Sequence, residues 1–113
     1  MTAAAPRPRD ALAQRLRDLL TSHVDVREVR MFGGLSFMVD DRMAVAARDG
    51  ELLVRTDPAD YDGLLRRGAI PARMGNDRVM GRGWLTVPEH LLHDDDELAY
   101  WLQIGIDSPT RRS

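Results

Sequence analysis

The segment from Arg27 to Arg55 constrains the fold most, because it is the one long stretch of the chain with strand character. Two polar pairs, Asp40-Asp41 and Asp49-Gly50, divide it into three parts. The second pair is the stronger hairpin signal, and we predict a type I′ turn there, with positive φ at both central residues. The whole segment is then a meander of three antiparallel strands. The strands are expected at Val29–Val39, Met43–Ala47 and Leu52–Arg55.

A glycine pair interrupts the first of these strands, in the motif Met31, Phe32, Gly33 and Gly34. One interpretation is a phosphate-binding loop, but the pair leads into a strand, and the chain has neither a G-x-G-x-x-G motif nor a lysine. The other is a bend or bulge, which glycine permits inside a strand. We predict a bend where the first strand crosses the sheet, with Met31 and Phe32 packed beneath a helix. The unbroken apolar run Leu52–Val54 predicts that parts of the sheet are covered on both faces.

Helix signals lie on both sides of this segment. Asp10 can cap a helix with a leucine-rich face. Asp57 can cap a second, short helix, which is expected to end at Gly68. An acidic run that starts at Asp94 opens a third helix. Two further strands are expected before that helix, one with a turn at Asn76-Asp77 and one at Trp84–Val87. Helices grouped around an antiparallel sheet predict a two-layer α+β domain.

The 113 residues suit a single domain. Residues 1–9 are predicted to be a flexible arm, 10–106 the folded domain, and 107–113 a disordered polar tail. The chain contains no cysteine, which excludes a disulfide framework, a thiolate metal site and a cysteine nucleophile. No stretch approaches the roughly 20 apolar residues of a membrane span, and none suits a signal peptide. We therefore expect a cytoplasmic protein.

Few residues form a pattern that indicates catalysis or metal binding. His90 and His93, with the acids that follow from Asp94, could contribute to a metal site. The alternative is that the acids cap a helix and the histidines lie on a solvated surface, because both histidines precede the expected helix start. No serine lies in a nucleophile elbow. We predict a protein that is not an enzyme and that uses no metal or cofactor.

The segment from Arg66 to Arg82 is locally basic, with five arginines and one acidic residue, although the whole chain has a net charge of −2. Arginines in such a segment can bind phosphate or an acidic protein surface, or they can simply be solvated. The candidate contact residues are Arg73, Arg78 and Arg82. Aromatic residues for stacking are scarce here, so nucleic-acid binding is the alternative hypothesis, not the leading one.

The last predicted helix has apolar residues on more than one side. Leu98, Trp101 and Gly105 share one side, whereas Tyr100 and Ile104 lie toward another. A helix of this kind is either buried over a wide arc or docked on a partner. We therefore take Tyr100 and Trp101, together with a free edge of the sheet, as candidate contacts for a protein partner.

Several parts of the chain resemble one known domain, in the same order. They are Arg30–Gly34, Phe37–Val39, Leu53–Arg55, Gly81–Leu85 and Trp101. Over residues 10–106 the chain resembles the N-terminal domain of the TfoX/Sxy family. The resemblance implies an α-β(3)-α-β(2)-α fold, similar in outline to secretion-chaperone-like domains, in which Met31–Gly34 is a signature of the fold. It implies neither enzyme activity nor a cofactor.

The best-known members of that family are coactivators of competence genes in bacteria, and they work with an activator of the cyclic-AMP receptor type. The resemblance therefore implies a regulator that acts through protein contacts, with the transcription machinery or a second copy of itself as partner. Nucleic-acid binding through the segment Arg66–Arg82 is the alternative, and no membrane contact is expected.

Overall fold

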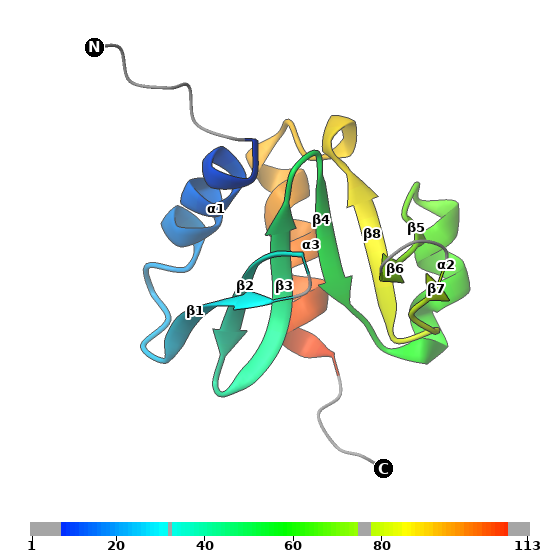
Figure 1. The fold of residues 1–113 in the computed structure, drawn as a ribbon, viewed down its shortest axis with the longest axis horizontal. Helices are drawn as coiled ribbons and strands as arrows, with labels where there is room; N and C mark the ends of the chain where they lie inside the picture. Colours follow the sequence, from blue (N-terminus) through cyan, green and yellow to red (C-terminus); the bar gives the residue numbers. More distant parts are fainter. Residues whose placement is uncertain (1–7, 32, 75–77, 109–113) are drawn as a thin grey trace.

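A six-stranded antiparallel sheet carries three helices on one face, in a computed structural model that describes residues 8–31, 33–74 and 78–108 (Figure 1). The helices are α1 (Pro8–Leu19), α2 (Tyr61–Arg66) and α3 (Asp95–Asp107), with 3-10 turns η1 (Pro58–Asp60) and η2 (Glu89–Leu91). The sheet has the order β1-β2-β3-β4-β8-β5, and β6 and β7 form a separate ribbon. The strands are β1 (Val26–Met31), β2 (Gly34–Val39), β3 (Arg42–Arg48), β4 (Glu51–Arg55), β5 (Ile70–Pro71), β6 (Arg73–Met74), β7 (Arg78–Val79) and β8 (Trp84–Pro88). The predicted α+β class is confirmed.

Helix α1 already includes Pro8, two residues before the expected cap at Asp10. Proline suits the first turn of a helix because an amide N–H there needs no intrahelical partner. The predicted leucine-rich face is confirmed, since Leu12, Leu16 and Leu20 are buried in the main core. Through this face α1 packs on β2 and β3.

The first predicted strand is two strands, β1 and β2, joined by a tight turn. Met31 pairs with Gly34, so only two residues separate the strands, and Gly33 has a φ of +75°. The prediction of one bent strand is therefore wrong, because a glycine that allows a bend equally allows a full reversal of the chain. The placement of Met31 beneath a helix is also wrong, since Met31 packs on the opposite face of the sheet. Phe32 lies outside the described residues.

The two remaining hairpin turns differ from the sequence prediction. Asp40 and Asp41 have φ of 54° and 67°, and positive φ at both central residues is the signature of a type I′ turn. In the turn after Arg48, Gly50 has a φ of 84° and is the one central residue with positive φ. The type I′ turn is therefore one hairpin earlier than predicted. Aspartate tolerates this backbone because its short side chain can bond to nearby backbone groups.

The centre of the sheet is covered on both faces, as the apolar run in β4 predicts. Leu52 and Val54 belong to the main core beneath the helices, whereas Leu53 belongs to a second cluster on the other face. The register between β2 and β3 shifts at the centre, which leaves Ala44 as an extra residue in β3. A Cβ atom on Gly105 would clash with the backbone carbonyl of Ala44, so α3 approaches β3 at this bulge without room for a side chain.

The predicted ends of the second helix are confirmed. Asp57 Oδ1 accepts a hydrogen bond of 2.9 Å from the amide of Ala59, which caps the 3-10 turn that leads into α2. Gly68 has a φ of 113°. The amide of Ala69 then donates to the carbonyl oxygen of Leu64 at 3.2 Å. This bond and the left-handed glycine form a Schellman motif, which closes the helix.

Gly63 inside α2 offers a test of this helix. A Cβ atom there would meet only a guanidinium nitrogen of Arg66, at 3.9 Å, which is an ordinary contact. We expect Gly63→Ala to raise the free energy of unfolding by about 0.5–1 kcal/mol, because alanine has less backbone freedom to lose in a helix. Urea unfolding of the two proteins measures this change. A loss of stability would contradict the helical conformation of this residue.

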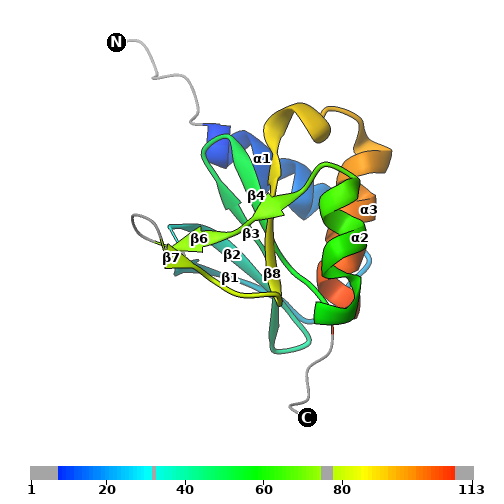
Figure 2. The same cartoon turned by 90° about the vertical axis from the view of Figure 1, so that its right-hand side faces the viewer.

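The segment after α2 returns over the second face of the sheet. The amide of Met80 donates to the carbonyl oxygen of Ala72 at 2.9 Å, which extends the pairing of β6 with β7. Ala72 is completely buried against this face. Figure 2 shows the ribbon on the side of the sheet opposite α2 and α3. The predicted turn at Asn76-Asp77 lies outside the described residues, and the strand predicted from Trp84 is confirmed as β8.

Helix α3 begins where its acidic start predicts. Asp94 Oδ1 accepts a hydrogen bond of 3.1 Å from the amide of Asp96. The predicted apolar side, with Leu98, Trp101 and Gly105, is buried against β3 and β4. None of the helices in the described part of the chain is both long and apolar enough to cross a membrane.

Candidate functional site

Four methionines and a tryptophan gather on the side of the sheet away from the helices. They are Met31, Met38, Met43, Met80 and Trp84, and they pack around the completely buried Ala46, Leu53 and Ala72. We call this cluster the methionine face. Its four methionines come from β1, β2, β3 and the end of the ribbon, so it exists only in the folded chain.

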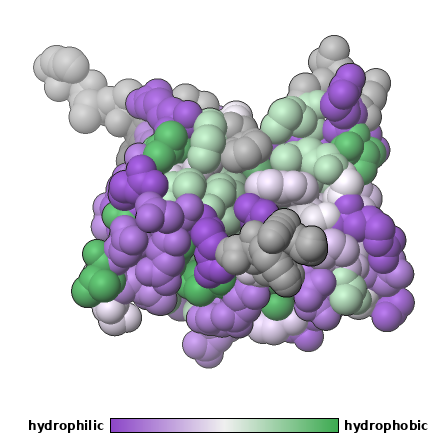
Figure 3. Space-filling view, turned by 90° about the horizontal axis from the view of Figure 1, so that it is seen from below, coloured by the Kyte–Doolittle hydropathy of each residue, from purple (hydrophilic) through white to green (hydrophobic). Residues whose placement is uncertain are grey.

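Strand pairing places these side chains on one face. Met38 pairs with Met43, and side chains of paired residues project from the same side of a sheet. Phe37 and Val45, which also pair, project toward the helices and belong to the main core. In Figure 3, which looks at the molecule from below, this side is seen in profile, with a hollow along which hydrophobic residues lie. Met43 is buried and the other three methionines are half-buried, so the methionine face is only partly accessible.

The ribbon has two different faces. Met74 pairs with Arg78, in register with the pair of Ala72 and Met80 that packs on the sheet. Because side chains alternate along a strand, Met74 and Arg78 continue the face that carries Met80. Arg73 and its partner Val79 project from the opposite face of the ribbon.

Two arginines at the methionine face lack a carboxylate partner within the described residues. Arg55 lies over the ring of Trp84, with its central carbon 5.6 Å from the ring centroid, and Arg78 is exposed. Arg48, in contrast, forms an ion pair of 3.1 Å with Glu51. The face therefore combines polarizable apolar side chains with two guanidinium groups that pair with none of the described carboxylates.

The predicted basic contact residues do not form one patch. Arg73 and Arg78 lie on opposite faces of the ribbon, as their pairing shows. Arg82 bonds to Asp62 at 3.2 Å and lies over the ring of Tyr61, 4.7 Å from the centroid. The structure thus places the three guanidinium groups in three different settings.

The two aromatic candidates on α3 have different environments. Trp101 is only 1% exposed and is a core residue, so the prediction that it contacts a partner is not supported by its position. Tyr100 is half-buried, meets Trp101 edge to face at 5.2 Å, and lies 4.2 Å beneath the guanidinium of Arg67. It lines an open depression of about 620 Å³ between α2 and α3, together with Arg66 and Ile104.

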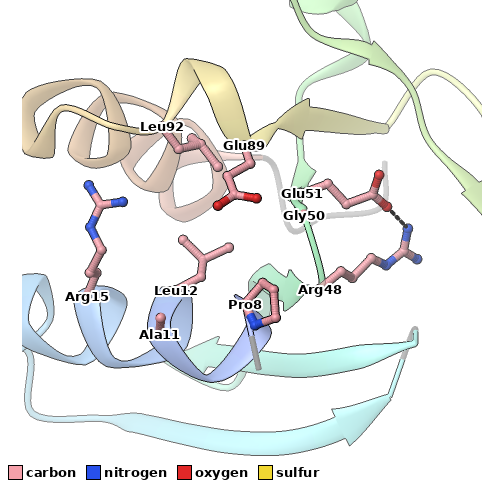
Figure 4. A pocket seen from close by; sticks show the side chains of 9 residues that line it. All are labelled: Pro8, Ala11, Leu12, Arg15, Arg48, Gly50, Glu51, Glu89 and Leu92. Carbon is pink, nitrogen blue, oxygen red and sulfur yellow. Dashed lines mark hydrogen bonds and ion pairs between the residues drawn. The ribbon is translucent and has the colours of Figure 1, made fainter. Parts of the chain in front are cut away.

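A small pocket lies between the start of α1, the β3–β4 turn and η2 (Figure 4). Arg15 stands at one side of it, the Arg48–Glu51 ion pair at the other, and Glu89 and Leu12 lie between them. Its volume is about 90 Å³. Sites for small organic ligands are usually about 300–1,000 Å³, so this pocket suits a few water molecules rather than a substrate.

An ion pair between α1 and β1 changes the pKa of a carboxyl group. Arg17 donates to both carboxylate oxygens of Glu28, at 2.6 and 2.8 Å, and these hydrogen bonds hold the pKa of Glu28 below its ordinary value. His90 and His93 are exposed. Within residues 8–31, 33–74 and 78–108, no group of three or more His, Asp or Glu side chains is placed to hold a metal ion.

Sequence reasoning missed the methionine face. Met31, Met38 and Met43 are spread over three strands, and Met80 joins them through a ribbon whose path the local sequence does not specify. The available signal was that three of the six methionines in the 113-residue chain fall in the segment with strand character, Arg27–Arg55. That signal gives no information about which face the side chains share.

Comparison with known proteins identifies one family. The family model of the TfoX N-terminal domain matches residues 18–108. Neither a curated protein nor a solved structure matches the chain significantly.

Proposed function

Because the chain belongs to the TfoX N-terminal domain family, we propose that it is a non-enzymatic domain that binds another protein through its methionine face. The observation that carries this proposal is the gathering of four methionines on the face of the sheet away from the helices, where three of them are only partly buried. Methionine is flexible and polarizable, and it is enriched on surfaces that accept apolar side chains of different shapes. An open apolar hollow on a small domain is typical of an interaction site.

The charge at the methionine face favours a particular kind of partner. Arg55 and Arg78 have no carboxylate partner within the described residues. A segment that presents large apolar side chains beside aspartate or glutamate would bury its apolar part on the methionines and pair its acids with these guanidinium groups. We propose that a protein segment with both acidic and large apolar side chains binds at the methionine face.

The family membership supports a regulatory role for this contact. We propose that the partner belongs to the transcription machinery, as in competence-type regulation. Direct nucleic-acid binding is the alternative. It is less favoured because Arg73 and Arg78 point from opposite faces of the ribbon and Arg82 is already paired with Asp62.

A matched pair of ribbon variants tests the proposal. Met74 and Val79 are exposed to similar degrees, 39% and 48%, but they lie on opposite faces of the same ribbon. We expect Met74→Asp to weaken partner binding at least about tenfold, because it places a carboxylate beside the apolar hollow. Val79→Asp carries the same charge change away from the hollow and should bind as the wild type does.

The measurement has two steps. Wild-type protein and both variants are used as baits in a nuclease-treated lysate of the native cell, and a captured protein is then purified and titrated against each bait by calorimetry. Equal affinity of that protein for wild type and Met74→Asp would contradict the proposal. Titration with duplex and single-stranded DNA at low salt tests the alternative, and binding that weakens steeply with added salt would favour nucleic acid as the partner.

A further inference from the structure

Strand β1 forms an open edge of the sheet. It stands at the end of the strand order, and its six residues pair only with β2. No other described element pairs with its outer side. An edge strand presents unpaired N–H and C=O groups, which form a template for another strand.

The hydrogen-bond pattern shows which backbone groups are unpaired. The amide of Asp40 donates to the carbonyl oxygen of Asp25 at 3.0 Å, so this pair is a hydrogen-bonded pair of the β1–β2 ladder. Such pairs alternate along an antiparallel ladder. Arg27, Val29 and Met31 therefore bond to β2, whereas the N–H and C=O groups of Val26, Glu28 and Arg30 point to the open side.

We propose that two copies of this chain pair antiparallel through β1, with the two-fold axis at Val29. The outward backbone groups limit the register, because hydrogen bonds between the copies form only where two of the outward-pointing residues Val26, Glu28 and Arg30 lie opposite each other. An axis at Arg27 places that charged residue opposite itself. An axis at Glu28 or at Arg30 places that residue opposite itself, with like charges in contact. An axis at Val29 places Glu28 of each copy opposite Arg30 of the other copy. The Val29 residues of the two copies then lie opposite each other at the centre.

The side chains at this edge fit that register. Arg30 is exposed and forms no ion pair within the described residues, so its charge is free to pair. Arg17 holds the Glu28 carboxylate in place through two hydrogen bonds. Such fixed, opposite charges facing each other across strands stabilise a pair of strands. In many proteins, charges on an edge strand prevent association. The experiment must therefore test whether Glu28 of one copy faces Arg30 of the other.

An exposed valine beside the edge is a separate observation. Val24, two residues before β1, has a relative exposure of 101% and is an apolar side chain in full contact with water. Val24 precedes the residues paired in this register, whereas Val29 lies at the two-fold axis. Pairing would therefore bury the half-exposed Val29 of both copies, which favours association.

Dimer formation through β1 would affect how the methionine face binds a partner, although the dimer proposal does not rest on the proposed function. Two-fold antiparallel pairing puts the same face of both sheets on the same side, so the dimer is one continuous sheet with both methionine faces on one side. A partner with two binding segments would then bind more tightly than either segment alone.

Charge exchange between two variants tests the register. In Glu28→Arg and in Arg30→Glu, each homodimer would contain two like-charge contacts, whereas a mixture of the two variants restores two opposite-charge contacts. We expect wild-type protein to sediment at twice 12.7 kDa at high concentration, each variant to dimerise at least about tenfold more weakly, and the mixture to recover dimer. Arg66→Glu, an exposed change of the same charge on α2, is the control and should leave dimerisation unchanged.

Disulfide capture tests the position of the two-fold axis in a chain that has no cysteine of its own. In the proposed dimer the Cα atoms of the two Val29 residues would lie about 4.5 Å apart, within the range that a disulfide spans. The Cα atoms of the two Arg27 residues would lie roughly 14 Å apart, which is beyond that range. Under mild copper–phenanthroline oxidation, Val29→Cys should therefore form a covalent dimer quickly, and Arg27→Cys, on the same face of β1, should not.

Three results would overturn the proposal. They are a wild-type protein that stays monomeric at every concentration, a dimer that Arg30→Glu leaves intact, and equal cross-linking of the two cysteine variants. Melting temperatures of Glu28→Arg and Arg30→Glu near that of the wild type show that any loss of dimer does not come from unfolding. The cross-linking result stands apart from the charge variants, because neither cysteine change touches Glu28 or Arg30.

Discussion

Trp101→Ala is expected to lower the free energy of unfolding by about 3–5 kcal/mol, the usual cost of removing a large aromatic side chain from a core. The Trp101 side chain is 1% exposed and is among the largest completely buried groups of the domain. Its indole N–H has no hydrogen-bond partner within the described residues, so the loss comes from packing alone. Urea unfolding at neutral pH measures the change.

Two control variants separate burial from surface contact. Trp101→Phe loses no hydrogen bond and keeps an aromatic ring, so it should lose less stability than Trp101→Ala. Tyr100→Ala removes the half-buried neighbour that lies against Arg67, and it should cost about 1–2 kcal/mol. A Trp101→Ala protein as stable as the wild type would contradict the core position. It would also return Trp101 to the candidates for a partner contact.

Gly34→Ala should lower the free energy of unfolding by about 3 kcal/mol, and Gly34→Val by more. A Cβ atom at Gly34 would lie in steric conflict with the backbone carbonyl of Ala47 in β3, with its carbon 2.9 Å away. A strand backbone cannot move aside as the end of a flexible side chain can, so β2 and β3 must separate locally. The melting temperature and the urea midpoint measure the loss.

The neighbouring glycine is the matched control. Gly33 has a φ of +75°, but a Cβ atom there would meet only Arg48 Nε, at 3.8 Å. Gly33→Ala should therefore cost only the strain of a left-handed residue, about 1–2 kcal/mol. If Gly33→Ala proves the more damaging change, the turn conformation, and not the close approach of β3, is what requires the glycine pair.

The local elements of this fold could be predicted because their causes lie within a few residues. The leucine spacing in α1, the caps at Asp57 and Asp94, and the glycine that ends α2 all act through neighbouring backbone groups. The apolar run of β4 likewise indicated that its centre is covered on both faces. These features give the α+β class, the three helices and the antiparallel sheet.

The sequence by itself thus determined the three helices, the class of fold and, through its motifs, membership of the TfoX N-terminal domain family. Only the tertiary structure decided that the glycine pair reverses the chain, that Trp101 is buried, and that Met31 and Met80 share one face. The physical reason is that each of these outcomes depends on pairing or packing between residues distant in the chain. A period of two or of 3.6 residues says which side chains share a face of one element, but not what that face will meet.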